Sequence, residues 1–241
     1  MTLKLDIMVL AAHPDDAELA CSGTIAKHIA QGKKVGIIDL TEGELGTRGS
    51  VPTRYEEAAL ASQIMRLSVR ENLRLPDGFF ENSREHQMPI IAAIRKYRPE
   101  IVLAKALHDR HPDHTRGAKI AYEACFLAGL RQIHTEAEGQ KQEAWRPKAL
   151  FHYIQDRYLS PDFVVDVSDF WQVKIEAIKA YRSQFFDPSS AEPETYISKP
   201  DFLDFVEARA REMGHAIGAT YGEGFCKGQP LGIKNLFDLL P

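Results

Sequence analysis

The chain has 241 residues, of which 44% are hydrophobic and 27% are charged, and its formal net charge is −4 at pH 7. This composition is ordinary for a globular protein, and the length is enough to bury a substantial core. The slight negative charge excludes a basic surface for nucleic acid or anionic membranes, and no apolar stretch approaches the roughly 18 residues of a spanning helix. The first residues lack the regions of a signal peptide. We therefore expect a cytoplasmic protein that binds neither nucleic acid nor membrane.

Strand-like and helix-like segments alternate along most of the chain. Short apolar runs predict strands, and apolar positions at helical spacing predict helices. The expected strands cover residues 5–12, 35–40, 72–76, 101–106, 150–155 and 163–167. The expected helices cover residues 15–31, 53–67, 84–97, 115–130, 170–182 and 200–218. This alternation predicts an α/β fold with a parallel sheet and helices on both of its faces.

The remaining segments are polar or rich in glycine and proline. Residues 132–146 predict an exposed excursion, residues 185–200 a long loop, and residues 221–232 a glycine-rich tail. We expect one domain over residues 1–241, with a core to residue 170 and a C-terminal elaboration of helix and loop over 171–241. Three widely spaced cysteines form no CxxC pair, so they are expected to be free, buried thiols, which suits a reducing cytoplasm. They are Cys21, Cys125 and Cys226.

Two clusters of metal-competent side chains each follow an expected strand. Residues 13–16 read His-Pro-Asp-Asp, and residues 108–114 read His-Asp-Arg-His-Pro-Asp-His. Open α/β sheets bind their ligands at the carboxyl ends of strands, so the two clusters can converge if their strands are neighbours. The side chains of His13, Asp16 and His114 would then supply the nitrogen and oxygen ligands typical of catalytic zinc. We expect one zinc ion per chain.

The neighbouring residues have chemistry that would serve a hydrolytic reaction. Zinc lowers the pKa of its bound water to about 7, and Asp15 could take the proton of that water as a general base. His111 could stabilise an oxyanion or protonate a leaving group, and Asp113 could hold His111 or His114 in one tautomer. Considered alone, Asp15 or Asp16 would be an N-cap of the following helix. The coincidence of the two clusters favours the metal site.

The segment after the second strand also has functional features. Residues 41–49 form a long loop with three glycines, and long loops between a strand and a helix are often functional. Arg54 lies in the first turn of the next helix, where the helix dipole disfavours a cation, so another group must require it there. His108 and Asp109 either support the site or lie in solvated loop. The other histidines, His28, His86, His134, His152 and His215, are expected to be structural.

The motifs at residues 12–16 and 111–114 resemble those of the PIG-L (LmbE-like) family of zinc-dependent N-acetylglucosaminyl deacetylases. Residues 41–44, Thr-Glu-Gly-Glu, and 54–57, Arg-Tyr-Glu-Glu, resemble the second-strand loop and the arginine helix of that family. The resemblance covers most of the first 125 residues and implies a Rossmann-like fold that removes the N-acetyl group from an amino sugar. It implies zinc ligation by His13, Asp16 and His114, a general base at Asp15, and an acid or oxyanion-stabilising role for His111 with Asp113.

The overall layout is most similar to the bacillithiol-pathway members, which remove acetate from N-acetylglucosaminyl malate. The resemblance implies that Arg54 contacts sugar hydroxyls, while Arg110 or Arg48 could bind a dicarboxylate substrate. Glu42 is a further candidate for substrate binding, as is Tyr196, because a mobile tyrosine of the later region often reaches the site. Competing candidates for that tyrosine are Tyr153, Tyr158, Tyr181 and Tyr221. Similar members form dimers or hexamers, so we expect a homo-oligomer.

Two other functions remain open at this point. A metal-dependent phosphoesterase also uses His and Asp at strand ends, but its second metal needs further ligands, for which Glu42 and Asp109 are available. A non-catalytic sugar-binding protein on the same fold would need no carboxylate such as Asp15 beside the metal. A dinucleotide cofactor is not predicted, because the first strand–helix turn lacks the G-x-G-x-x-G pattern.

Overall fold

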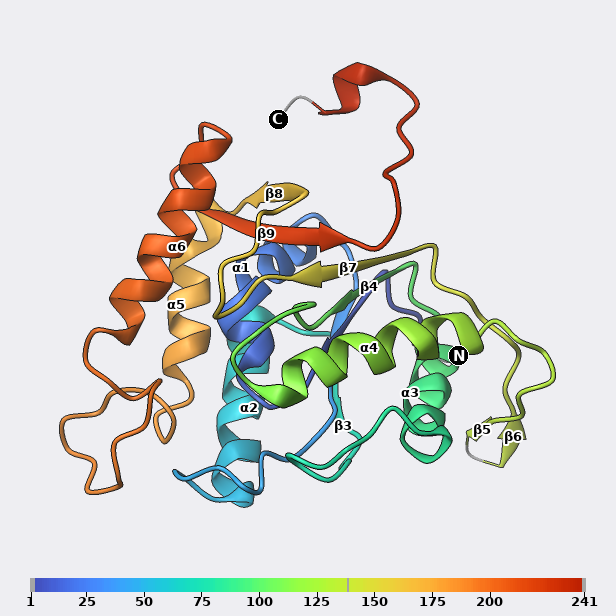
Figure 1. Cartoon of the computed structure of the whole chain (residues 1–241), viewed down its shortest axis with the longest axis horizontal. Coiled ribbons are helices and arrows are strands. Elements are labelled where there is room, and N and C mark those ends of the chain that lie inside the picture. The colour runs from blue at the N-terminus through green and yellow to red at the C-terminus, as the bar shows by residue number, and fades with distance from the viewer. Residues whose placement is uncertain (1–2, 138, 240–241) are drawn as a thin grey trace.

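The computed structural model describes residues 3–137 and 139–239. Within these residues, seven strands form one sheet in the order β3-β2-β1-β4-β7-β9-β8 (Figure 1). The strands are β1 (Ile7–Ala11), β2 (Val35–Asp39), β3 (Val69–Asn72), β4 (Ile101–Ala104), β7 (Ala149–Tyr153), β8 (Phe163–Asp166) and β9 (Gly222–Lys227). The helices are α1 (Asp16–Ala30), α2 (Val51–Met65), α3 (Arg84–Tyr97), α4 (Pro112–Leu127), α5 (Trp171–Lys179) and α6 (Phe202–Ala216), with short 3₁₀ helices η1 (Ser168–Phe170) and η2 (Leu236–Leu239). The expected polar excursion carries a small separate hairpin of β5 (Glu136–Ala137) and β6 (Gln140–Lys141).

The order of the strands places a crevice beside β1. Strand β1 pairs in parallel with both β2 and β4, β2 pairs in parallel with β3, and β4 with β7. The chain therefore winds outward from β1 to β3 on one side and continues at β4 on the other. Ligands of such sheets bind outside the carboxyl ends of the strands where the winding direction changes. The ends of β1 and β4, which the two predicted clusters follow, border this point.

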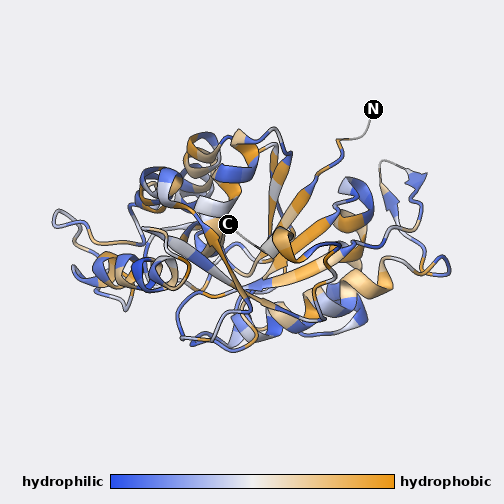
Figure 2. Cartoon of the chain, turned by 90° about the horizontal axis from the view of Figure 1, so that it is seen from above, coloured by the Kyte–Doolittle hydropathy of each residue, from blue (hydrophilic) through white to orange (hydrophobic). Residues whose placement is uncertain are grey.

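Two apolar layers confirm that helices cover both faces of the sheet, and Figure 2 shows the apolar strands between them. Because side chains alternate along a strand, Val9 faces one layer and its neighbours Met8 and Leu10 face the other. Helices α1, α2 and α5 contribute to the first layer, and α3 and α4 to the second. Helix α6 packs beside β9. The predicted α/β fold is confirmed, with β8 and β9 as antiparallel additions.

Helix α1 is interrupted near its middle, and a carboxylate of strand β9 binds the backbone N–H groups that follow the interruption. Its backbone leaves helical angles at Cys21, where φ is −141° and ψ is 18°. The carboxylate of Glu223 on β9 accepts the backbone N–H groups of residues 23 and 24, at 3.0 and 2.7 Å. The buried ammonium of Lys174 on α5 lies 2.7 Å from Glu223 Oε1 and donates to the carbonyl oxygen of Leu19 at 2.8 Å. The ion pair thus supplies hydrogen-bond partners for backbone N–H and carbonyl groups that have none within an interrupted helix.

Two expected elements differ from the structure. The third strand lies at Val69–Asn72 instead of 72–76. This edge strand is half-buried and polar, so it lacks the apolar run that predicts a strand. The apolar Leu75, which suggested the later bounds, packs into the core after the strand has ended. The expected tail at 221–232 contains β9, which lies inside the sheet. Its glycines reflect close packing: a Cβ at Gly222 would lie 2.5 Å from a methyl carbon of Val164.

All three cysteines are buried and free, as expected. Among the described residues, no helix is both long and apolar enough to cross a lipid bilayer.

Candidate active site

The two clusters predicted from the sequence meet at the carboxyl edge of β1 and β4. The ring centroids of His13 and His111 are 4.7 Å apart, those of His13 and His114 5.7 Å, and those of His111 and His114 5.2 Å. The three imidazoles lie at a cavity of about 320 Å³, which is in the size range of small-ligand sites. Asp15, Asp16 and Arg54 also line this cavity.

Asp16 is buried between the two imidazoles that were expected to share its metal. Its Oδ2 accepts the backbone N–H of His13 at 2.9 Å and lies 3.4 Å from the Nδ1 of the same residue, while its Oδ1 lies 3.1 Å from His114 Nε2. Lys105 Nζ and Gln155 Nε2 each approach Oδ1 to 2.8 Å. Burial would raise the pKa of Asp16, but the charges of His114 and Lys105 hold this pKa well below its usual range. The carboxylate is therefore ionised and oriented.

The donor atoms at this cavity fit a divalent metal ion. Asp16 approaches the two imidazoles through different oxygens, and further nitrogen and oxygen donors surround His13. Nitrogen and carboxylate oxygen donors are the ligands that zinc takes in catalytic sites. Among the described residues, ligand atoms that all lie within 4.8 Å of one another are offered by two groups: His13, His111 and His114, and His13, Asp77 and Asp113. Asp16 belongs to neither group, so the expected set of His13, Asp16 and His114 is not one of them.

Carboxylates contact ring nitrogens of both imidazoles, and one of these carboxylates, Asp77, also lines the cavity. Asp109 Oδ2 lies 2.8 Å from His114 Nδ1, so Asp109 has the supporting role that was one of its two expected alternatives. Asp77 Oδ1 lies 2.9 Å from His13 Nε2. The carboxylate of Asp113 was expected to hold His111 or His114, but it lies 3.3 Å from His13 Nε2. Asp113 lies in the first turn of helix α4, and its side chain is directed toward the loop at Gly78, whose N–H it accepts at 2.7 Å.

Asp15 has a strained backbone and a buried side chain. Its φ of 118° lies in the region that favours glycine, and its carboxylate makes no helix-capping hydrogen bond within the described residues. Asp15 thus occupies the N-cap position of α1, but its side chain does not make the capping hydrogen bond that this alternative assigns to it. Arg54 Nη2 lies 3.1 Å from Asp15 Oδ2. Burial raises the pKa of Asp15 to about 7, with the nearby Arg54 opposing and Asp16 adding to the shift. A carboxyl group with such a pKa can exchange a proton near neutral pH.

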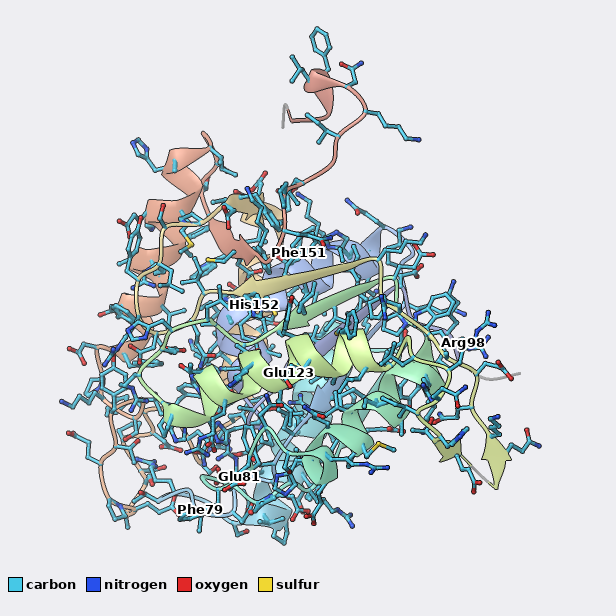
Figure 3. All side chains as sticks on the ribbon, turned by 45° about the vertical axis from the view of Figure 1, so that its right-hand side comes forward. Phe79, Glu81, Arg98, Glu123, Phe151 and His152 are labelled. Atoms are coloured by element: carbon cyan, nitrogen blue, oxygen red, sulfur yellow. The ribbon has the colours of Figure 1, made fainter. Side chains whose placement is uncertain are left out.

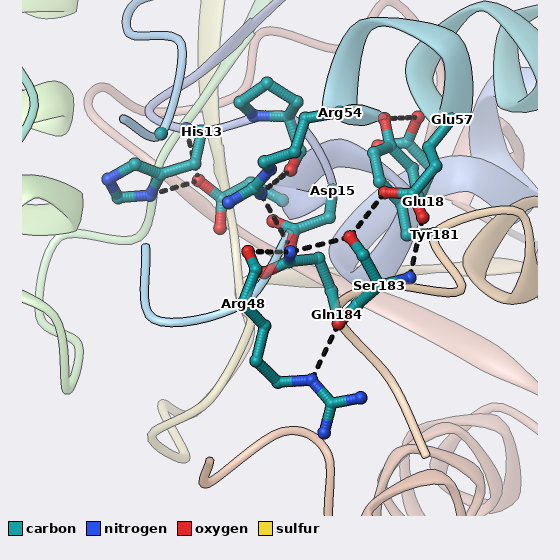
Figure 4. Close-up of polar contacts among 12 residues, drawn as sticks. His13, Asp15, Glu18, Arg48, Arg54, Glu57, Tyr181, Ser183 and Gln184 are labelled. Atoms are coloured by element: carbon teal, nitrogen blue, oxygen red, sulfur yellow. Dashed lines mark hydrogen bonds and ion pairs between the residues drawn. The ribbon is translucent and has the colours of Figure 1, made fainter. Parts of the chain in front are cut away.

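Arg54 lines the cavity, and Figure 4 shows its guanidinium beside Asp15. Its Nη2 also donates to the carbonyl oxygen of Pro14, while its Nε and Nη1 have no acceptor among the residues that the structure describes. A Cβ at Gly43, where φ is +68°, would lie 2.7 Å from Nη1, and a Cβ at Gly46 would lie 3.3 Å from it. Gly43 thus leaves the space that the guanidinium occupies, and a side chain at Gly46 would make a tight contact with it.

His111 is held as a neutral hydrogen-bond donor. Its Nδ1 accepts the backbone N–H of Asp113 at 3.2 Å, so in the neutral ring the proton is on Nε2. Burial lowers the pKa of His111 to about 4, and the positive charges of His13 and His114 contribute to the shift.

Arg110 and Tyr196 lie together at one side of the cavity mouth. Arg110 lines the cavity, and its Nε makes an ion pair of 2.9 Å with Asp156. Its guanidinium stacks 4.3 Å from the ring centroid of Tyr196, whose hydroxyl lies 3.3 Å from Asp156. Tyr196 itself is outside the cavity lining, but the next residue, Ile197, is part of it.

Two other expected substrate contacts lie elsewhere. Glu42 lines a neighbouring cavity on the other side of Arg54, because its Oε1 accepts the hydroxyl of Tyr55 at 2.6 Å. Arg48 donates to the carbonyl oxygen of Ser183 at 2.7 Å, and Figure 4 shows its guanidinium directed away from Asp15. It fastens the loop after α5 and is not part of the cavity lining.

Three polar residues of the site were not predicted as functional. Lys105 and Gln155 hold Asp16, and Asp77 holds His13. Lys105 and Gln155 follow β4 and β7 directly or after one residue, so the strand-end rule that found the histidines could have found them too. Asp77 lies in a turn, and only its contact with His13 in the folded chain identifies it as part of the site.

Comparisons with known proteins agree with this geometry. Residues 8–125 match the model of the family described as GlcNAc-PI de-N-acetylase, PIG-L. The chain is 30% identical over 189 residues to diacetylchitobiose deacetylase of Thermococcus kodakarensis, covering 74% of this chain and 70% of that protein. It is 27% identical to 4-oxalmesaconate hydratase of Pseudomonas putida, over 76% and 75% of the two chains. The crystal structure of the conserved protein TT1542 from Thermus thermophilus is similar with a TM-score of 0.86 and 37% identity, over 96% and 98% of the two chains.

Proposed function

The chain belongs to the GlcNAc-PI de-N-acetylase (PIG-L) family, and from this premise we propose that it is a zinc-dependent N-deacetylase of an N-acetylglucosaminyl conjugate. The proposed reaction hydrolyses the N-acetyl amide and releases acetate and a free amine. The observation that carries the proposal is the strained, buried Asp15 beside a cluster of nitrogen and carboxylate donors. A backbone held in a disfavoured region persists only where the surroundings enforce it, and such positions concentrate at functional sites.

The proposed metal ligands are His13, Asp16 and His114. Zinc bound there would polarise the amide carbonyl and make water acidic near neutral pH. The fit rests on the donor types and on Asp16, whose two oxygens approach the two imidazoles at 3.4 and 3.1 Å. Asp77 and Asp109 would keep the rings in a fixed orientation, which is the usual task of a carboxylate behind a metal-binding histidine.

Asp15 is the proposed general base. It would accept a proton from the attacking water as the water oxygen adds to the amide carbon. When the C–N bond breaks, the same carboxyl group would return this proton to the departing nitrogen. A pKa of about 7, raised by burial, suits both directions of transfer at neutral pH.

His111 and Arg54 are the proposed groups that bind the substrate around the reacting amide. The Nε2–H of neutral His111 would donate to the oxygen that becomes negative in the transition state. This favours the oxyanion role over the acid role, because the lowered pKa leaves the ring neutral at pH 7. Nη1 of Arg54, which has no acceptor among the described residues, would donate to a sugar hydroxyl.

Within this class we propose N-acetylglucosaminyl malate as the substrate, on the resemblance to the bacillithiol-pathway members. Arg110 supports the proposal as the cation at the cavity mouth, although Asp156 neutralises part of its charge. A homo-oligomer and a cytoplasmic location complete the proposal, and the free cysteines suit a reducing compartment.

The experiment is to measure acetate release from N-acetylglucosaminyl malate, free N-acetylglucosamine and diacetylchitobiose, together with the metal content of the purified protein. We expect one zinc ion per chain and the highest kcat/KM for the malate conjugate. Equal values for all three compounds would refute the malate assignment. Two metal ions per chain with phosphoesterase turnover, or hydration of an unsaturated dicarboxylate without acetate release, would refute the deacetylase itself.

A further inference from the structure

A second, smaller cavity lies beside the active-site cavity, between the segment that follows β7 and helix α6. Five residues line both cavities, which are therefore neighbours: Leu19, Arg110, His114, Gln155 and Ile197. In Figure 3, the labelled His152 lies near the end of β7 that points toward α6. The volume of this side pocket is about 50 Å³. A buried water molecule needs about 10–15 Å³, so the side pocket has room for a group of a few heavy atoms, such as a carboxylate.

The lining of the side pocket has an excess of positive charge. Apart from the imidazole of His114, the charged side chains in this lining, within the described residues, comprise three cations and two anions: Arg110, Lys174, Arg209, Asp156 and Glu223. Lys174 and Glu223 form an ion pair with each other at 2.7 Å. Asp156 is then left to balance two arginines, and one positive charge remains.

The carboxylate of Asp156 is already bound by other groups. Its Oδ2 accepts from Arg110 Nε at 2.9 Å, and its Oδ1 accepts the hydroxyl of Tyr196 at 3.3 Å. Toward Arg209 it presents its backbone carbonyl oxygen, which accepts from Nη2 at 3.2 Å. The carboxylate of Glu212 lies 4.0 Å from Arg209 Nε, but its side chain is 61% exposed, so solvent screens this contact. The charge of Arg209 therefore has no close carboxylate inside the side pocket among the residues that the structure describes.

One hydrogen-bond donor of Arg209 also lacks an acceptor. Its Nη1 is buried and has no hydrogen-bond partner within the described residues, and the whole side chain is 14% exposed. The guanidinium lies 5.4 and 5.2 Å from the ring centroids of Tyr158 and Phe205, which hold it without taking its hydrogen bonds. A buried charged donor without an acceptor is costly, so it indicates a partner that the folded chain itself does not supply.

We propose that the side pocket is a carboxylate-binding subsite, in which Arg209 determines specificity for amino sugars whose substituent carries a carboxylate. The inference rests on the proposed function, because the sugar must occupy the active-site cavity for its substituent to enter the side pocket. Hydrogen bonds from a guanidinium to a carboxylate are about twice as strong as those between neutral groups. Arg110 lines both cavities, so a substituent with two carboxylates can bind both arginines.

The experiment measures KM of the wild type and of Arg209→Gln for N-acetylglucosaminyl malate and for methyl N-acetylglucosaminide, which carries no carboxylate. We expect KM for the malate conjugate to rise at least about tenfold in Arg209→Gln, as for the loss of a hydrogen bond to a charged group, and KM for the methyl compound to change by less than about twofold. Arg209→Lys, which keeps the charge, should recover part of the loss. Arg211→Gln is the matched control, because the side chain of Arg211 on the same helix is 55% exposed and pairs with Glu207, so this variant should alter KM for neither compound.

Binding of both compounds to the Asp15→Asn variant, measured by calorimetry, separates this inference from the proposed function. Tighter binding of the malate conjugate that is lost when Arg209→Gln is added supports the subsite even if the wild type releases no acetate, a result that refutes the deacetylase alone. Equal affinity of the two compounds for Asp15→Asn, a comparison that needs no change at Arg209, overturns the subsite. An unchanged KM for the malate conjugate in Arg209→Gln overturns it as well. So does an equal rise in KM for both compounds, because Arg209 would then support the fold of the cavity and bind no carboxylate.

Discussion

Removing the charge of Glu223 should destabilise the whole protein, because this carboxylate joins the break of α1 to α5 and β9. In the Glu223→Gln variant the amide can still accept one backbone N–H. However, the ammonium of Lys174, whose side chain is 2% exposed, loses its counter-ion in the protein interior. Taking one partner from a buried ion pair costs about 3–5 kcal/mol, because the remaining charge is neither hydrated nor paired.

Glutamine can replace only part of what the Glu223 carboxylate contributes. Glu223 Oε1 accepts from both Lys174 and the N–H of Gly23, and Oε2 accepts from Thr24. The amide oxygen of glutamine can replace one oxygen, so we expect a loss near the lower limit, about 3 kcal/mol. For a chain of this length each kcal/mol lowers Tm by about 2–4 °C, which predicts a decrease of about 10 °C.

The assay is urea denaturation followed by circular dichroism at pH 7. Glu207→Gln is the control, because Glu207 pairs with Arg211 at 2.7 Å on the exposed side of α6, where a pair contributes less than about 1 kcal/mol. The double variant Lys174→Met with Glu223→Gln should be less destabilised than the sum of the single variants, because neither charge then remains alone. A Glu223→Gln variant within about 1 kcal/mol of the wild type, or strict additivity in the double variant, would show that Lys174 does not need this carboxylate.

Four further predictions concern the site. Asp15→Asn should keep its zinc in metal analysis but lose at least about 100-fold in kcat, as expected for a lost general base, and unchanged turnover would contradict the assignment. Asp109→Asn should weaken zinc binding about 10- to 100-fold in calorimetry, because it releases the 2.8 Å contact to His114, while equal affinity would argue against zinc at this histidine. Gly43→Ala should raise KM at least about fivefold, since its Cβ would lie 2.7 Å from Arg54 Nη1. Gly139→Ala is the control for backbone strain, because Gly139 also has a positive φ but has no atom within 4 Å of the new Cβ. Burial would raise the pKa of Asp77, but the contact with His13 lowers this pKa from 3.8 to about 2. The resulting stabilisation of the folded protein, about 2 kcal/mol, is therefore complete above pH 4 and is lost as the pH falls through 2. In urea titrations the stability difference between the wild type and Asp77→Asn should shrink over this pH range, and a constant difference would contradict the prediction.

The sequence predicted the centre of the site because that centre consists of compact motifs at strand ends. His13, Asp16 and His114 come together since β1 and β4 are neighbours in the sheet, a pairing that the alternation of strands and helices had left open. Strand-end position does not define the direction of a side chain, however. Glu42 follows β2 as expected, yet the hydroxyl of Tyr55 holds it in the adjacent cavity.

Contacts between distant segments could not be predicted from local patterns. Asp77 is a single polar residue without a motif, and its role depends on a turn that reaches His13 only in the folded chain. Strand β9 was missed because glycine normally disfavours strands, whereas here Gly222 and Gly224 admit the close approach of helix α6. The periodicity of apolar residues predicts a strand or helix from its side chains. It fails for a strand such as β9, where the neighbouring helix can pack closely only because glycine has no side chain.

The position of β9 has a consequence for the order in which the protein is made. The ribosome makes His13 and Asp16 well before β9, but the broken helix α1 is capped by Glu223, 200 residues after Gly23. Contacts of such long sequence separation form late, because a long loop must close before they can stabilise anything. We therefore expect the first helix of the site to become native only after the last strand has left the ribosome. The nascent chain can fold its early β–α units while the candidate site remains incomplete until β9 is available.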